Sequence, residues 1–433
     1  MISVACVLAL VAGTGGVIAA REGQDAARTS AITQANSLAA DAASLVPTDP
    51  GLAAQFAVAA YRASPTPSAS SQLYASLQSP LDRVLAVTGS GVLRVAAQSH
   101  GSLAAAVDAD GSLRIWDAAD AGKPVLESTL RSGVAAIALA PRRAVLAGAC
   151  PGRKALCLWN VSDPRRPVLW ASVPLPQKTH SITSMAISHD GTLLAAAAEP
   201  GFTLVWSISD PQRPQRVALL PNPTTDPSAG LPAVAFSPRA NLLAQTIQHG
   251  KTQIWNLSNP AAPVRQATIP AGYRAIAFSP DGTLLSAVGE TGIGLWKVTH
   301  LARPVSISLI ADTPDIMTSV AFSPDGAWLA YGGTGIESPQ SALCLVDLSP
   351  SSLDTHGGPT PDCTPTGFGT YTVAYSPGGA ILTGGADGDV RLWRQPLPQA
   401  GGMSIGAGDL WGISPDGRLI AAPLGSAGTI FPS

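Results

Sequence analysis

The chain has few charged residues. Only 12% of its 433 residues are Asp, Glu, Lys or Arg, about half the share of an ordinary globular protein, and the formal net charge is -2. A chain without a basic surface lacks the electrostatic footprint of nucleic-acid binders. Its six His are scattered singly, which argues against a metal site built from histidines. We therefore expect neither a nucleic-acid partner nor a bound metal.

Cysteine is also scarce, with five residues and no Cys-x-x-Cys pair, which disfavours a zinc knuckle. Cys150 and Cys157 flank a predicted turn, and Cys344 and Cys363 lie in successive strand and loop segments. Either pair could form a disulfide if the domain lies outside the cytoplasm. Buried reduced thiols that act as small hydrophobes are the equal alternative.

Catalytic motifs are missing too. The chain has no Gly-x-Ser-x-Gly elbow and no His-Glu-x-x-His pair. Gly250-Lys251-Thr252 resembles the end of a phosphate-binding loop, but Gln245 stands where the earlier glycine is required and no helix follows. Two predicted turns carry paired carboxylates, namely Asp108, Asp110, Asp387 and Asp389. Such Asp-Gly turns usually need these residues for backbone geometry, so we expect no catalytic residues and no cofactor.

Glycine (43 residues) and proline (38 residues) are abundant and separate short alternating apolar segments. The clearest copy of the resulting unit is Gly272–Val298. It predicts a strand that ends at Phe278, a tight turn at Ser279-Pro280-Asp281-Gly282, a second strand over 283–288 and a third over 293–298 that carries Trp296. One such unit cannot bury its own apolar faces, so it requires stacked neighbours.

The unit recurs along the chain, with one anchor in the first turn and another in the third strand. The turn anchors are His100, Pro141, His189, Pro238, Pro280, Pro324, Pro377 and Pro415. The third-strand anchors are Trp116, Trp159, Trp206, Trp255, Trp296 and Trp393, with Val346 in one copy and Phe431 in the last. Five prolines each lie eight residues after a Trp: Pro124, Pro167, Pro214, Pro263 and Pro304. Proline suits the start of an edge strand, so we predict a fourth, outermost strand in each unit.

The repeated pattern AFSPDG…LL…W resembles the WD-repeat β-propeller family over Leu81–Ser433. The Trp-Asp dipeptide is present only at Trp116-Asp117, and the Gly-His before the first strand is absent, so the polar network that braces blades in that family must be incomplete. The resemblance implies an all-β propeller of four-stranded antiparallel blades over residues 80–433. Eight anchors predict eight blades, with Arg83 to Val87 completing the last blade and closing the ring; seven blades is the alternative.

The amino-terminal segment is of a different kind. Ile2 to Ala20 is an uncharged run of 19 residues, long enough to span a bilayer as a helix. We expect a retained membrane anchor over residues 1–20, with a cleaved signal peptide or a buried helix as the alternatives. Residues 21–79 predict an Ala-rich helical stalk. Its first helix carries an apolar stripe of Leu38, Ala42 and Leu45 and stops at Pro47.

Prolines divide the rest of this stalk. Asp49-Pro50 is typical of a helix start and predicts a second helix through Arg62. Pro65-Thr66-Pro67 ends that helix, and we predict a third helix over Ser70 to Leu77.

The family usually binds partners on the rim that the turns between the second and third strands share. Here those turns carry the candidate binding residues Arg153, Lys154, Phe202, His249, Lys251 and Glu290. An exposed aromatic such as Phe202 could anchor a contact; the alternative is a side chain folded over its own blade.

These features predict a non-catalytic, single-pass membrane protein whose propeller lies outside the cytoplasm and binds a protein or peptide as a scaffold or sensor. The helical segment followed by repeats with Asp-Pro links also resembles the carboxy-terminal halves of large actinobacterial signalling proteins, in which an ATPase or kinase-like domain precedes a membrane segment. An extracytoplasmic propeller enzyme, lactonase-like or quinone-dependent, is an alternative, as is a truncated remnant of a larger signalling protein.

Overall fold

The computed structural model describes residues 26–46, 50–78, 81–87, 90–119, 124–131, 133–150, 154–177, 179–199, 201–221, 232–246, 251–269, 274–289, 292–301, 303–310, 315–335, 342–353, 361–365, 369–376, 378–393, 412–413, 419–424 and 427–432. The chain divides into two compact units. One unit comprises Met1–Arg83 and Pro396–Ser433, and the other comprises Val84–Gln395.

Three helices follow one another in the first unit, over residues 26–45, in α2 (Pro50–Ala63) and in α3 (Pro67–Gln78). The starts of α2 and α3 follow from proline, which is favoured at the first helical position. Thr66 caps α3, because its Oγ1 accepts a hydrogen bond of 3.2 Å from the N–H of Ala69. The third helix therefore begins three residues earlier than the predicted Ser70.

Alanine forms most of the contacts between these helices. One cluster joins Ala39, Ala60 and Ala69, and a second joins Ala42, Ala57 and Leu73. The predicted stripe is thus shifted, since Leu38 and Leu45 are only half-buried while the alanines beside them are fully buried. No helix in the described ranges is long and apolar enough to cross a membrane. The predicted anchor over residues 1–20 lies outside the described residues.

The last predicted repeat unit also belongs to the first unit. It forms a three-stranded sheet of β29 (Gly412–Ile413), β30 (Leu419–Leu424) and β31 (Ala427–Pro432), with Phe431 opposite Ile420. The strand at 81–87 does not pair with this sheet, so the prediction of an eighth blade is wrong.

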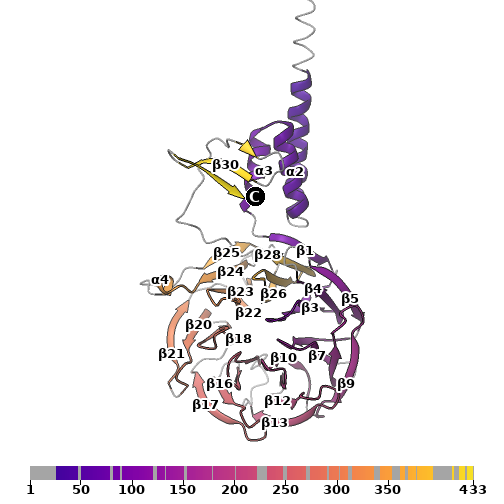
Figure 1. Ribbon diagram of the computed structural model, residues 1–433, viewed down its shortest axis with the longest axis vertical. Helices are drawn as coiled ribbons and strands as arrows, with labels where there is room; N and C mark the ends of the chain where they lie inside the picture. The colour runs from indigo at the N-terminus through magenta and orange to yellow at the C-terminus, as the bar shows by residue number, and fades with distance from the viewer. Residues whose placement is uncertain are drawn as a thin grey trace, which may run out of the picture. The chain divides into compact units, whose positions relative to one another are not determined.

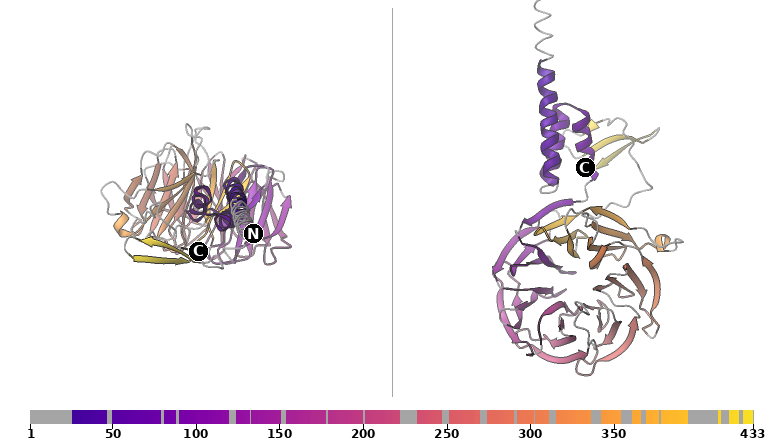
Figure 2. Two further views of the ribbon diagram at one scale, coloured as in Figure 1. Left: turned by 90° about the horizontal axis from the view of Figure 1, so that it is seen from above. Right: turned by 180° about the vertical axis from the view of Figure 1, so that it is seen from behind.

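The second unit is a propeller of seven four-stranded antiparallel blades arranged as a ring, seen from the front in Figure 1 and from behind in Figure 2. Blade 1 contains β2 (Val92–Ala97), β3 (Leu103–Asp108), β4 (Ser112–Asp117) and β5 (Val125–Arg131). Blade 2 contains β6 (Ala136–Leu139), β7 (Val145–Cys150), β8 (Ala155–Asn160) and β9 (Val168–Pro174). Blade 3 contains β10 (Ile182–Ile187), β11 (Leu193–Ala198), β12 (Phe202–Ser207) and β13 (Gln215–Pro221).

The remaining blades repeat the same order. Blade 4 contains β14 (Val234–Phe236), β15 (Leu242–Gln245), β16 (Thr252–Asn256) and β17 (Val264–Ile269). Blade 5 contains β18 (Ala275–Phe278), β19 (Leu284–Gly289), β20 (Gly292–Lys297) and β21 (Val305–Ile310). Blade 6 contains β22 (Asp315–Phe322), β23 (Trp328–Gly335), β24 (Ala342–Asp347) and β25 (Asp362–Pro365), with the short helix α4 (Pro350–Leu353) before β25.

Blade 7 closes the ring. It contains β26 (Thr370–Tyr375), β27 (Ile381–Gly385) and β28 (Asp389–Trp393), and its outer strand is β1 (Leu81–Val87), which pairs with β28. The predicted closing strand thus exists, but it completes the seventh blade rather than an eighth. Because β1 pairs with β28, that strand is not left as an open sheet edge.

Local sequence signals explain each blade. Each of the five predicted prolines immediately precedes an outer strand, such as Pro304 before β21. In the Ser-Pro-Asp-Gly turn of blade 5, Ser279 Oγ donates to Asp281 Oδ1 and accepts from the N–H of Leu284, and Gly282 has a φ of +70°. Apolar clusters between adjacent blades hold the ring together; that of blades 2 and 3, for example, contains Trp206.

The indole N–H groups of the anchoring Trp residues differ in their bonding. Trp393 Nε1 donates to Thr383 Oγ1 at 2.7 Å within blade 7. Trp255 Nε1 in blade 4 is buried and finds no acceptor among the described atoms. The hydrogen bond from the anchoring indole therefore differs between blades, and apolar packing contributes more of the stability of a blade where this bond is missing.

Two disulfides form within blades. Cys150 joins Cys157 across β7 and β8, and Cys344 joins Cys363, its direct partner in the β24–β25 register. The alternative of reduced, buried thiols at these positions is not what the structure shows.

Candidate functional site

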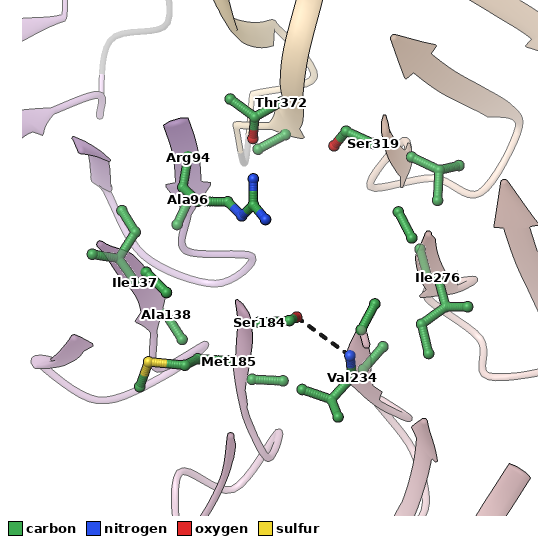
Figure 3. Close-up of a pocket in the computed structure, with 18 of the residues that line it drawn as sticks. Arg94, Ala96, Ile137, Ala138, Ser184, Met185, Val234, Ile276, Ser319 and Thr372 are labelled. Carbon is green, nitrogen blue, oxygen red and sulfur yellow. Dashed lines mark hydrogen bonds between the residues drawn. The ribbon is translucent and has the colours of Figure 1, made fainter. Parts of the chain in front are cut away.

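A central cavity of about 410 Å³ lies on the propeller axis and is lined by the first strand of every blade (Figure 3). These strands are β2, β6, β10, β14, β18, β22 and β26, and each blade contributes three to five residues to the wall. The turns that follow them fix a common alignment, because Gln98, Ser188 and Ser279 each donate a backbone N–H to the carbonyl five residues on.

One layer of the wall consists of alanine only. Each blade has an alanine two residues before the turn residue that corresponds to Gln98, Ser188 and Ser279. Six of these alanines line the cavity: Ala96, Ala138, Ala186, Ala235, Ala277 and Ala374. Methyl groups at this level leave the channel wide, and the larger aliphatic residues next to them, such as Ile137 and Val234, are buried against the neighbouring blades.

Two residues further back, hydroxyl groups join neighbouring blades. Ser319 Oγ accepts from the N–H of Val373 at 2.9 Å, and Thr372 Oγ1 accepts from the N–H of Val95 at 3.1 Å. Ser184 Oγ accepts in the same way from the N–H of Val234 at 3.3 Å (Figure 3). These bonds satisfy first-strand amides across the blade junctions and fix the shape of the channel.

Blade 1 has Arg94 at this level instead of a small residue, and its guanidinium points into the channel (Figure 3). Arg94 Nη1 donates to the carbonyl of Leu93 at 2.8 Å, and Nη2 donates to the carbonyl of Thr183, on blade 3, at 3.1 Å. Burial of the charged group lowers the pKa of Arg94. Among the described residues that line the cavity there is no Asp or Glu, while Arg274 of blade 5 adds a second guanidinium to the wall.

Three of the six predicted rim residues lie in the described part of the chain, on three different blades. Lys154, which has a φ of 45°, and Lys251 are exposed, on blades 2 and 4. Phe202 begins β12 of blade 3, is half-buried and packs against the apolar cluster between blades 2 and 3. Arg153, His249 and Glu290 lie outside the described residues.

The paired aspartates have partners within their own blades. Asp108 forms an ion pair with Arg114, and Asp110 Oδ1 accepts from the N–H of Ser112 at 2.8 Å, as expected of a turn residue. Burial raises the pKa of the Asp108 carboxyl, and the Arg114 charge opposes the shift. Hydrogen bonds from Ser112 lower the pKa of Asp110.

In blade 7, Arg391 pairs with both Asp387 and Asp389. Burial raises the pKa of Asp389, and the Arg391 charge opposes this rise. None of these aspartates lines the central cavity.

Sequence reasoning missed two features. The first is Arg94, whose position in the channel wall emerges only when blade 1 is aligned through Gln98 rather than through His100. The second is the pair His100 and His189, whose rings meet edge to face with centroids 5.2 Å apart although they belong to blades 1 and 3. Burial and the nearby Arg142 charge lower the pKa of His189. The sequence signal for this pair was a histidine in the turn after the first strand of each of these two blades.

The comparison with protein families agrees with this architecture. Residues 81–117, 174–207 and 363–394 match the family model described as WD domain, G-beta repeat. Three stretches of this propeller are WD repeats. The first match starts at β1 and ends with β4, so one sequence repeat supplies the outer strand of blade 7 and three strands of blade 1. No curated protein matches the chain.

WD-repeat propellers commonly bind proteins. The fold and the matched repeats are those of this kind of propeller. They name no partner.

Proposed function

We propose that this protein is a membrane-anchored interaction or sensor module whose propeller binds a protein or peptide and has no catalytic role. The observation that carries the proposal is the seven-bladed propeller with WD repeats in three places. Such a ring offers a rigid rim of turns, and rigid scaffolds that carry variable loops are suited to recognition.

The binding surface that we propose is the rim formed by the turns between second and third strands. Lys154 and Lys251 give it exposed positive charge on blades 2 and 4. The half-buried Phe202 serves this surface better as a support for blade 3 than as an exposed anchor, since it packs on the core.

The membrane anchor and the side of the membrane belong to the same proposal. The uncharged run Ile2 to Ala20 supports an anchor. The Cys150–Cys157 and Cys344–Cys363 disulfides support a propeller outside the cytoplasm, because disulfides persist in oxidising compartments. The resemblance to actinobacterial signalling proteins suggests a receiver whose effector lies elsewhere.

A lactonase-like or quinone-dependent enzyme would need several polar groups converging on the channel. The described lining supplies two arginines and no carboxylate. This arrangement supports a non-catalytic role.

Proximity labelling with the tagged full chain in its native host tests the proposal. We expect the wild type to label a reproducible protein in the membrane fraction, and Lys154→Glu with Lys251→Glu to lose that labelling. The matched control reverses two exposed charges on outer strands, Arg216→Glu and Arg265→Glu, and should label the same protein as the wild type. Equal loss in both variants, or a chain absent from membranes, would refute the proposal.

Sidedness is tested separately with membrane-impermeant thiol reagents on a chain carrying an added surface cysteine, Ser209→Cys. Labelling of intact cells is expected for a propeller outside the cytoplasm. Labelling only after lysis would place the propeller inside.

A further inference from the structure

Arg94 occupies a position where no other blade places a charge. The equivalent residues on the other six first strands are Ala136, Ser184, Ala233, Ala275, Ser319 and Thr372. An alanine or serine would therefore fit the fold at this level, and the ring does not require an arginine here. Its guanidinium instead reaches past blade 2 to the carbonyl of Thr183 on blade 3.

The charge of Arg94 has no described counter-ion. A guanidinium has five N–H donors, and the described acceptors are two backbone carbonyls, those of Leu93 and Thr183. Carbonyl oxygens carry only partial charge, and no carboxylate lines this part of the cavity. Arg94 is half-buried, and removing a charge from water without a partner is costly. Burial accordingly lowers the pKa of Arg94. An anion in the channel would offset that cost.

The rest of the wall is apolar at the next level. The alanine layer lies two residues along the first strands from the level of Arg94, and Met185 and Ile276 beside these alanines belong to the apolar clusters between blades. The hydroxyls of Ser184, Ser319 and Thr372 are already engaged with backbone amides of adjacent blades. The cavity thus combines the guanidiniums of Arg94 and Arg274 with a layer of alanine methyl groups, at a volume of about 410 Å³, within the ordinary range for small-molecule sites.

We propose that the channel binds a small organic acid, with its carboxylate on the Arg94 guanidinium and its hydrocarbon body against the alanine layer. The planar fork of arginine matches a carboxylate in a bidentate manner. Inorganic phosphate would satisfy the fork and leave the apolar wall unused. This site lies inside the ring and does not depend on the partner proposed for the rim.

Titration calorimetry on the full chain with hexanoate tests this site. Hexanol, which has the same hydrocarbon body without the charge, acetate, which has the charge without the body, and inorganic phosphate are the comparison probes. We expect hexanoate to bind at least about tenfold more tightly than any of them, since both halves of the ligand contribute.

Arg94→Gln should weaken hexanoate binding by about tenfold or more, because a charge-assisted hydrogen-bond pair is lost. Arg94→Lys keeps the charge but not the planar guanidinium, so its affinity for hexanoate should lie between those of the wild type and Arg94→Gln. Arg216→Gln removes an exposed arginine from the outer strand β13 and should leave the affinity unchanged.

A second variant, Ala186→Leu, fills the channel without touching Arg94 and should abolish binding. It keeps the test decisive if Arg94→Gln fails to fold. Absence of hexanoate binding to the wild type, unchanged affinity in Ala186→Leu or in folded Arg94→Gln, or equal affinity for phosphate would each overturn the proposal.

Discussion

Blade 5 takes its four strands from one continuous stretch, β18 to β21, whereas blade 7 takes three strands from β26 to β28 and its outer strand from β1. In blade 5 the order of the chain alone brings the strands together. In blade 7 the outer strand lies about 300 residues before its neighbour, so closing that blade costs more chain entropy, although this cost grows only slowly with the length of the loop. Interactions within blade 7 must offset this cost.

The interior contacts of the two blades differ accordingly. In blade 5 the ring of Trp296 lies over Gly294, two residues earlier in β20. The same position in blade 7 is Arg391, which is only 7% exposed and pairs with Asp387 and Asp389. Blade 7 also has the Trp393–Thr383 hydrogen bond. The blade that closes the ring therefore has a buried ion pair at the position where the regular blade has a glycine under an indole ring.

The largest expected effect comes from removing β1. A chain without residues 1–87 should lose the cooperative unfolding transition of the propeller, because β28 and the apolar face beside Leu85 lose their cover. The loss should consume most of the roughly 5–15 kcal/mol by which a domain is stable. Urea denaturation followed by circular dichroism measures it.

The matched control deletes residues 1–78 and keeps β1. We expect this shorter deletion to retain the transition. Identical midpoints for the two deletions would show that β1 does not close the ring.

The next largest effect is expected from Arg391→Met. It leaves the buried carboxylates of Asp387 and Asp389 without their cation, and breaking a buried pair in this way costs about 3–5 kcal/mol. Lys297→Met, at an exposed position on β20 of blade 5, should change the unfolding free energy by less than about 0.5 kcal/mol. Comparable losses in the two variants would contradict the distinction between the blades.

Sequence reasoning predicted the features of this fold that are local. The Ser-Pro-Asp-Gly turns, the third-strand Trp and the proline before each outer strand all depend on residues within a few positions, so their chemistry is legible without the structure. The number of blades depends instead on which distant strand covers β28. Pro415 and Phe431 repeat the local pattern in full, yet their sheet belongs to the other unit.

The position of Arg94 in the channel could not be predicted from the sequence for a related reason. The turn of blade 1 begins at Gln98, and alignment on His100 as its second residue shifts the first strand by one residue. The backbone bond from Gln98 to Leu103 corrects the shift, and Arg94 then falls at the level of Ser184, inside the channel. A shift of one residue reverses the face of every side chain in a strand, so this site required the structure.

A smaller effect is expected from Gly294→Ala in blade 5. A Cβ at this position would lie 1.9 Å from Cη2 of Trp296, so the indole must move. Overpacking of this kind typically costs about 1–3 kcal/mol. The double variant Gly294→Ala with Trp296→Leu gives a direct check, since removing the ring removes the clash. A cost of Gly294→Ala that persists unchanged beside Leu would show that the ring is not its cause.

The smallest effect distinguishes the carboxylates of the two blades by pH. Burial raises the pKa of Asp389, so the folded state holds its proton more tightly than the unfolded state, and the contribution of Asp389 to stability falls as pH rises above about 4. Asp281 has the opposite sign. Partial burial raises its pKa, but hydrogen bonds from Ser279 and Thr283 outweigh burial and lower it overall. Its contribution is present above about pH 4 and is lost as pH falls through its lowered pKa.

Urea midpoints of the wild type, Asp281→Asn and Asp389→Asn between about pH 3 and 6 should therefore give difference curves of opposite slope. Curves of the same slope would mean that the two aspartates are held in equivalent surroundings, which the ion pair in blade 7 and the exposed turn in blade 5 argue against.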